Sequence, residues 1–121
     1  MSLVVGLDVG TQSVKLVAYD SVAHEVLATH SHALEGVAQD DGSREQEAQW
    51  WIDAIRSCFA KLDPALRARV VALGVSGQQH GCVPVDAAGQ VLAPAKLWCD
   101  TSTQAECDGI RGAVGGPLRA V

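Results

Sequence analysis

The chain has 121 residues, of which 48% are hydrophobic and 19% charged, and its formal net charge is −5. This length and composition are typical of one globular domain with its own core, and they exclude a disordered chain. The basic residues are scattered, so we expect no nucleic acid partner, which would need a clustered basic face. With no apolar run long enough to span a membrane and no basic leader, we expect a cytoplasmic protein with no membrane contact, whose four cysteines are free thiols.

The first third of the chain predicts three strands. Apolar runs predict strands at residues 3–8 and 13–20, joined by a turn at Gly10, and the alternation over 25–34 predicts a third. Their short connections favour an antiparallel meander. A polar, glycine-bearing loop is expected over residues 36–44.

A change of period predicts a helix from Glu45 to Leu62, where apolar residues recur at helical spacing. Acidic Glu45 and Glu47 would fall in its first turn and Lys61 in its last, as the helix dipole favours. Pro64 follows just beyond the expected end. The continuous apolar run that comes next, residues 70–75, is typical of a strand buried on both faces.

Beyond this strand comes a polar loop between glycines, residues 76–81, and then a hairpin with its turn at 86–89. Pro84 and Pro94 would place that hairpin at a sheet edge or make it irregular.

The last predicted element is a helix capped by Thr101 or Ser102 and extending to about Ile110. The order strand, strand, strand, helix, strand, hairpin predicts an α/β fold with a mixed sheet.

The stretch GLDVGTQSVKLVAYD, residues 6–20, places a carboxylate, Asp8, at the end of an apolar strand. The polar or small residues that follow it in one short turn are Gly10, Thr11, Gln12, Ser13 and Lys15. Phosphoryl transfer needs such groups, because N–H and hydroxyl donors surround phosphate oxygens while a carboxylate serves the metal. The loop has neither the GxxxxGK[ST] nor the GxGxxG pattern. A plain hairpin whose aspartate caps backbone amides is the alternative.

The motif LDVGTQSVKLVAYD resembles the first phosphate-binding motif of the FGGY carbohydrate kinases, which belong to the actin, hexokinase and Hsp70 superfamily. Residues 76–103, SGQQHGCVPVDAAGQVLAPAKLWCDTST, resemble the sugar-contacting segment of the xylulokinase branch. Residues 44–51, REQEAQWW, are similar to a helix start in that branch. The resemblance runs in colinear order from about Leu3 to Thr103. It implies a ribonuclease H-like fold, with residues 1–121 forming the N-terminal part of the sugar-binding domain.

The resemblance also implies roles for matching positions. Asp8 would organise the phosphates and a water-bridged Mg²⁺. The other residues of the first phosphate loop, residues 6–15, that would face the phosphates of ATP are Gly10, Thr11, Gln12, Ser13 and Lys15. Gln79 and His80 would contact sugar hydroxyls, and an amide and an imidazole offer both donors and acceptors for this. Trp98 and Asp100 would lie near the sugar. Many xylulokinases carry Met in place of Gln79, which leaves the pentulose open.

The implied reaction of the full-length protein is ATP-dependent phosphorylation of a ketopentose, with D-xylulose to D-xylulose 5-phosphate as the first candidate. The catalytic base aspartate and the C-terminal nucleotide-binding domain would lie beyond residue 121, so we expect this chain alone to be inactive. A homodimer is expected at full length. The alternatives are another FGGY member, such as a ribulokinase or glycerol kinase, and a non-enzymatic sugar-sensing or interaction module. A chaperone-type or acetate-kinase-type ATPase would share only the first loop, and the 76–103 segment argues against it.

Overall fold

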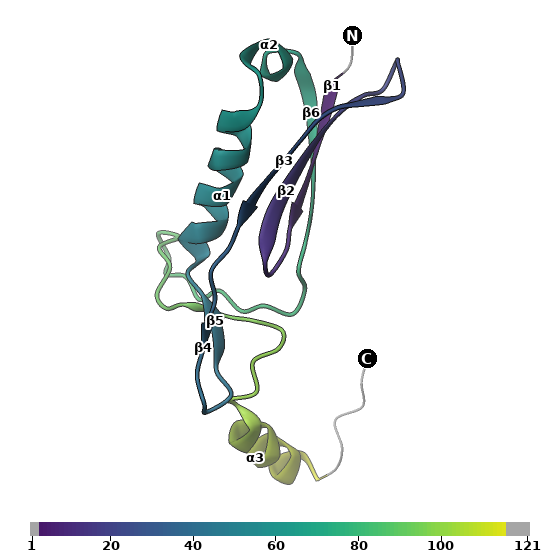
Figure 1. The fold of residues 1–121 in the computed structure, drawn as a ribbon. Helices are drawn as coiled ribbons and strands as arrows, with labels where there is room; N and C mark the ends of the chain where they lie inside the picture. Colours follow the sequence, from purple (N-terminus) through teal and green to yellow (C-terminus); the bar gives the residue numbers. More distant parts are fainter. Residues whose placement is uncertain (1–2, 116–121) are drawn as a thin grey trace.

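The computed structural model describes residues 3–115, so residues 1–2 and 116–121 of the expected domain lie outside the description. A four-stranded sheet of order β3-β2-β1-β6 forms its centre (Figure 1). The strands are β1 (Leu3–Val9), β2 (Ser13–Asp20), β3 (Glu25–Ala33) and β6 (Val70–Gly77). The first three pair antiparallel, whereas β6 runs parallel to β1. The predicted meander and mixed sheet are therefore confirmed.

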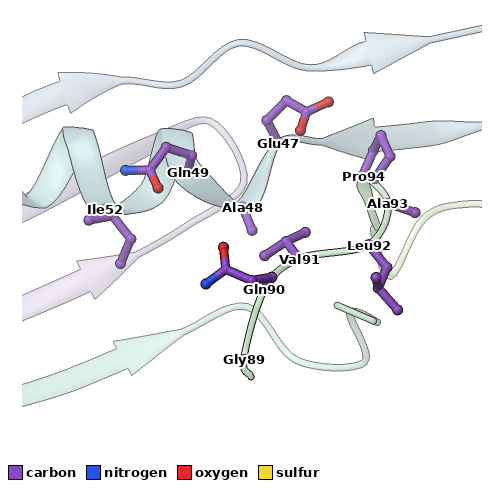
Figure 2. A pocket seen from close by; sticks show the side chains of 10 residues that line it. All are labelled: Glu47, Ala48, Gln49, Ile52, Gly89, Gln90, Val91, Leu92, Ala93 and Pro94. Atoms are coloured by element: carbon purple, nitrogen blue, oxygen red, sulfur yellow. The ribbon is translucent and has the colours of Figure 1, made fainter. Parts of the chain in front are cut away.

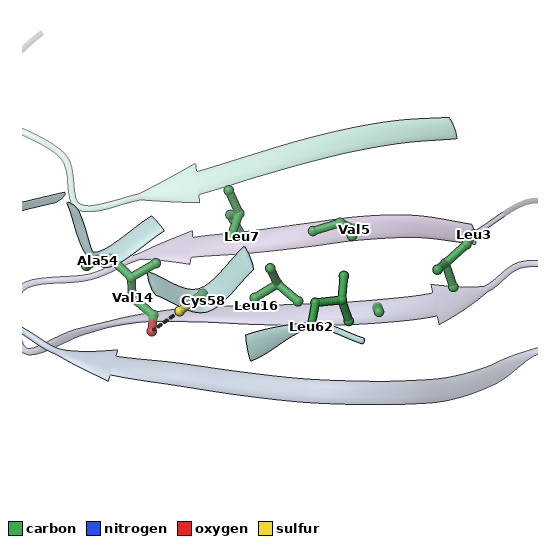
Figure 3. Close-up of a cluster of buried hydrophobic side chains, with 9 residues drawn as sticks. Leu3, Val5, Leu7, Val14, Leu16, Ala54, Cys58 and Leu62 are labelled. Carbon is green, nitrogen blue, oxygen red and sulfur yellow. Dashed lines mark hydrogen bonds between the residues drawn. The ribbon is translucent and has the colours of Figure 1, made fainter. Parts of the chain in front are cut away.

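The core lies between the sheet and α1 (Ala48–Lys61), which runs along one face of β2 and β3 (Figure 1). Alternate residues of β1 and β2 point toward the helix, because successive side chains of a strand face opposite sides. The buried cluster consists of Leu3, Val5, Leu7, Val14, Leu16, Ala18, Ala54, Cys58 and Leu62 (Figure 3). Burying each large side chain contributes about 1.5–3 kcal/mol, which fixes α1 on the sheet.

The helix begins three residues later than expected, so the prediction for its first turn is wrong. Glu45 belongs to β5 (Arg44–Gln46), and Glu47 is the residue that precedes the helix in extended backbone. The backbone here pairs with other strands, and that long-range pairing overrides the local helical pattern. Lys61 does lie in the last turn, as expected.

A second, three-stranded sheet has the order β4-β5-β7, and its first strand and the start of its second fall in the loop expected over residues 36–44. Its other strands are β4 (Val37–Ala38) and β7 (Ala95–Lys96), both antiparallel to β5. The loop expected over 36–44 is therefore shortened, and Gly42 makes its turn at φ 90°. Sequence patterns missed these strands because each has only two or three residues.

The hairpin turn at residues 86–89 is confirmed. Asp86 donates its backbone N–H to the Gln90 carbonyl, and Gly89 takes φ 79°. Beyond the turn the two arms form isolated bridges, Val85 with Val91 and Cys82 with Lys96, so the pairing is irregular, as the two prolines predicted.

The last helix, α3 (Gln104–Val114), follows Thr103 rather than Thr101 or Ser102 and ends later than expected. Ser102 is instead engaged by the Asp100 carboxylate, which removes it as a helix cap. No helix within residues 3–115 has the length and apolar character needed to cross a membrane.

The expectation that residues 70–75 are buried on both faces is wrong for the described residues. Val71, Leu73 and Val75 of β6 are 67%, 53% and 64% exposed. The strand forms the edge of the sheet, and α1 packs on β2 and β3 instead. The short helix α2 (Pro64–Arg67), capped by the Asp63 carboxylate, connects α1 to this strand.

Candidate functional site

The candidate site forms where β1 and β6 end together. These strands are parallel, so their carboxyl ends meet at one edge of the sheet, where open α/β sheets place ligands. Asp8 lies between Lys15 on β2 and Ser76 on β6 in the strand register. The Ser76 hydroxyl donates to the exposed Asp8 carboxylate across 3.4 Å. Among residues 3–115 no loop amide donates to Asp8. This geometry therefore argues against the alternative of a plain hairpin whose aspartate caps backbone amides.

The loop after β1 is a tight turn. Gly10 donates its N–H to the Ser13 carbonyl at 3.0 Å, and a Cβ on Gly10 would lie 3.1 Å from that oxygen. The Leu34 N–H donates to the Gln12 carbonyl at 2.8 Å, which ties the turn to the end of β3. The backbone of the loop is thus held from two sides while Gln12 and Lys15 stay exposed.

A cavity of about 540 Å³ opens beside this turn. Its lining residues are Asp8, Gly10, Thr11, Gln12, Ser13, Lys15, Trp98 and Cys99. All six residues predicted to face phosphates therefore line one cavity, together with one residue predicted to lie near the sugar. Trp98 is 60% exposed, and its Nε1 donates to the Thr11 hydroxyl at 3.1 Å.

Gln79 and His80 lie on the loop that follows β6, and both are exposed. His80 lines a neighbouring cavity of about 330 Å³, and Gln79 lines neither of these two cavities. His80 adopts φ 60°, in the left-handed region that non-glycine residues seldom occupy. The loop starts with the Gln78 N–H donating to the Val9 carbonyl at 3.0 Å, which keeps the two loops adjacent.

Asp100 lines neither of the two cavities, and its carboxylate is hydrogen-bonded by other groups of the protein. Its Oδ1 accepts from the Ser102 hydroxyl and N–H at 2.6 and 2.9 Å, and its Oδ2 accepts from the Arg44 N–H at 2.8 Å. Its side chain is 4% exposed and lies 3.4 Å from the Lys96 ammonium. The hydrogen bonds from Ser102 and Arg44 hold the pKa of Asp100 well below its usual range. Hydrogen bonding to Glu45 raises the pKa of Lys96.

A third concavity, of about 590 Å³, lies between the start of α1 and residues 89–94 (Figure 2). Apolar side chains such as Ile52 and Val91 line it together with amides, and none of the predicted site residues does. It plays no part in the site.

Comparison with known proteins identifies the family of the chain. Residues 3–116 match the model of the N-terminal domain of the FGGY family of carbohydrate kinases. The chain belongs to this family.

Several curated FGGY relatives carry the name xylulose kinase. One, from Haemophilus influenzae, is 39% identical over 119 residues and is aligned with 93% of this chain and 24% of its own length. Another, from Arthrobacter sp., is 41% identical over 103 residues, which cover 83% of this chain and 96% of that sequence. The chain spans about a quarter of the length of the xylulose kinases of Haemophilus influenzae and Streptomyces coelicolor.

Solved FGGY structures confirm the ribonuclease H-like fold class. A structure named as a xyloylose kinase from Brucella ovis has a TM-score of 0.84 at 30% identity and covers 93% of this chain and 24% of its own. The xylulose kinase of Rhodospirillum rubrum has a TM-score of 0.83 at 25% identity, covering 92% of this chain and 23% of its own.

The site of this FGGY chain fits a nucleotide with magnesium. No three His, Cys, Asp or Glu side chains within residues 3–115 group as a metal site. Mg²⁺ commonly keeps several waters and binds through one or two carboxylates plus substrate phosphates, so the single exposed carboxylate of Asp8 suits the metal and the Lys15 ammonium suits the phosphates.

Sequence reasoning missed three polar residues that shape the site. Gln46 is buried and contacts the first loop, Gln78 joins the two loops, and Lys96 holds Asp100. Gln46 and Gln78 lie inside the motifs REQEAQWW and SGQQHG, but nothing in either motif indicates that they meet, because that contact joins residues far apart in sequence.

Proposed function

We propose that the full-length protein containing this chain transfers the γ-phosphoryl group of ATP to a hydroxyl of a ketopentose. D-xylulose is the first candidate, with D-xylulose 5-phosphate as product. One observation carries the proposal: Trp98, from the segment that resembles the sugar-contacting part of xylulokinases, donates to the Thr11 hydroxyl of the first loop. Residues of the two stretches that resemble the phosphate-binding and sugar-contacting motifs thus line one cavity, which supports the proposal. The names of the curated relatives support the choice of sugar.

ATP and Mg²⁺ would supply the phosphoryl group and neutralise its charge when bound. The chain's own contribution is positioning. The Asp8 carboxylate would orient water around the metal, Lys15 would add a positive charge, and the hydroxyls and N–H groups of residues 10–13 would bind phosphate oxygens. Because the turn is already tight, little reorganisation would accompany binding.

The sugar would lie between the loop after β6 and the Trp98 ring. His80 and Gln79 would exchange hydrogen bonds with its hydroxyls, and the exposed indole would cover an apolar face of the ring. Asp100 stays a prediction as a sugar-contacting residue. In the present arrangement its oxygens are satisfied by protein donors, so we assign it the role of holding the Trp98 segment in place.

The remaining parts of the reaction would belong to the rest of the protein. We propose that residues 1–121 form the first part of the sugar-binding domain, with the catalytic base and the adenine site in later residues. Closure of two domains would then exclude water. We also propose a cytoplasmic homodimer at full length.

The test measures ADP release by the full-length protein with D-xylulose, L-ribulose, D-ribulose or glycerol. We expect selective turnover of D-xylulose. Asp8→Ala should lower kcat by about 100-fold or more, because it removes charge organisation in the transition state. His80→Ala should raise KM for the sugar about 10-fold with a smaller effect on kcat, as loss of a sugar hydrogen bond predicts.

His24→Ala is the matched control. His24 is also an exposed histidine with φ 59°, but it lies in the β2–β3 turn, away from both cavities. It should change neither constant more than twofold. Turnover of another sugar of the panel would reassign the substrate within the family, and no turnover of any would count against the kinase proposal. The 121-residue chain alone should release no ADP above background.

A further inference from the structure

We propose that Gln46 is a positioning residue that locks the loop after β1 to the loop after β6, so that phosphoryl donor and sugar acceptor meet in register. The inference rests on the proposed function, because it concerns the two loops assigned there to phosphate and sugar. It is carried by a closed set of hydrogen bonds in which three side chains, Gln46, Thr11 and Gln78, take part.

The Gln46 amide is buried and fully used. Its side chain is 1% exposed. Its Nε2 donates to the Thr11 carbonyl and the Glu35 carbonyl, both at 2.7 Å. Its Oε1 accepts from the Trp51 indole at 3.1 Å and from Gln78 Nε2 at 3.4 Å. An amide side chain has two donor hydrogens and two acceptor sites, so each has a partner.

The direction of every bond follows from groups that cannot change roles. The Trp51 indole only donates, and the two carbonyls only accept, which determines which end of the Gln46 amide is oxygen. Gln78 must then present its nitrogen to Gln46 and its oxygen to the Thr11 hydroxyl, at 3.0 Å.

The donor and acceptor directions of this network extend to residues that line the candidate site. The Thr11 hydroxyl uses its hydrogen in the bond to Gln78, so its oxygen is free to accept a hydrogen bond from Trp98 Nε1 at 3.1 Å. Gln46 therefore sets, through Gln78, the orientation of a hydroxyl on the phosphate loop and of an indole in the candidate sugar segment. A buried polar network of this kind favours one geometry over its alternatives. Misplacement of reacting groups by about 1 Å can lower rates on the order of 100-fold.

The experiment uses the full-length protein and two isosteric changes. Gln46→Glu removes both donors and places a carboxylate against two carbonyl oxygens. Gln78→Glu keeps an acceptor for Thr11 but replaces the donor to Gln46 with oxygen. Gln49→Glu is the control, because it is the same change at an exposed position on α1, outside the network.

The readout is the ratio of sugar phosphorylation to ATP hydrolysis measured without sugar, together with KM for each substrate. We expect Gln46→Glu and Gln78→Glu to lower this ratio about 10-fold or more and to raise KM for the sugar, while Gln49→Glu stays within twofold of the wild type. Loss of folded protein would scale both rates together and leave the ratio and both KM values unchanged.

An unchanged ratio in the folded variants overturns the inference. Should Gln46→Glu fail to fold, the half-buried Gln78→Glu decides the outcome by the same ratio. The two proposals fail in different ways. A wild-type protein that turns over none of the sugars overturns the proposed function and this inference with it. An active wild type whose Gln78→Glu variant is unaffected overturns this inference alone.

Discussion

At the scale of single residues, His80 combines an expected sugar contact with an unusual backbone conformation. A non-glycine residue at φ 60° is strained, and such strain persists where function or surroundings hold it in place. His80 lies between Gln79 and Gly81 on an exposed loop, so packing gives little reason for the conformation. His24 takes nearly the same φ in a turn without an assigned role, so the case for His80 rests on its place on the loop after β6 and not on its backbone angle.

We predict that His80→Gly is more stable than His80→Ala by about 0.5–1 kcal/mol. Both variants lack the imidazole. They differ only in the Cβ, which is strained at positive φ in alanine and absent in glycine. Urea unfolding of the two variants measures the difference. Both should show the same raised KM for the sugar. Equal stabilities would contradict the strain argument, while unequal KM values would mean that loop shape, not the imidazole, sets affinity.

At the scale of elements, the Asp100 carboxylate connects strands and a helix start that lie far apart in the sequence. Asp100 receives hydrogen bonds from Arg44 at the start of β5 and from Ser102 just before α3. Lys96 of β7 bridges Asp100 and Glu45 at 3.4 and 3.1 Å. This cluster holds the three-stranded sheet against the segment that carries Trp98. Its stability therefore depends on Asp100 being ionised.

We predict a specific acid dependence from this cluster. The pKa of Asp100 is lowered in the folded state, while an unfolded aspartate titrates near about 3.9. In the window between these pKa values the unfolded state binds more protons, so the free energy of unfolding falls as pH falls below about 4. Asp100→Asn should be less stable at pH 7 and should lose part of this dependence. Melting temperatures from pH 7 to pH 3 measure it, and parallel curves for the two proteins would contradict the prediction.

At the scale of the whole molecule, β6 leaves apolar side chains without cover. Val71, Leu73 and Val75 are more than half exposed within the described residues. The corresponding face of β1 is buried by α1, so these three residues extend an apolar surface beyond the helix. The chain also spans only about a quarter of the length of the Haemophilus influenzae and Streptomyces coelicolor relatives. We expect later residues of the full-length protein to pack on this strand.

This expectation predicts different costs for one substitution in two proteins. Leu73→Ala should cost less than about 1 kcal/mol in the 121-residue chain, because the side chain is 53% exposed there. In the full-length protein it should cost about 2–5 kcal/mol, as for a buried leucine. Leu16→Ala, fully buried under α1, should cost about 2–5 kcal/mol in both. Chemical denaturation of the four variants decides, and an equally small cost of Leu73→Ala in both proteins would mean that β6 stays uncovered.

The parts that could be predicted from sequence are those whose signal is local. The strands β1 to β3, the body of α1 and the turn at residues 86–89 all have periods or turn residues that identify them. The polar turn after β1 could be found for the same reason, since all its polar residues lie within one short stretch, and its role toward phosphates stays a prediction. What failed was the start of α1, the loop at 36–44 and the burial of β6. The start of α1 and the burial of β6 depend on a partner far away in sequence, or on its absence among the described residues, whereas β4 is too short to give a pattern.

By itself, then, the amino-acid sequence determined the strand meander, the polar turn after β1 and the FGGY resemblance, because each is identified from short stretches that can be read without knowing how the chain folds. Only the tertiary structure decided that Trp98 reaches Thr11, that Asp100 is occupied by protein groups, and that Gln46 joins two loops. Those contacts bring together residues 35 to 87 positions apart, and at such separations geometry depends on how the whole sheet packs.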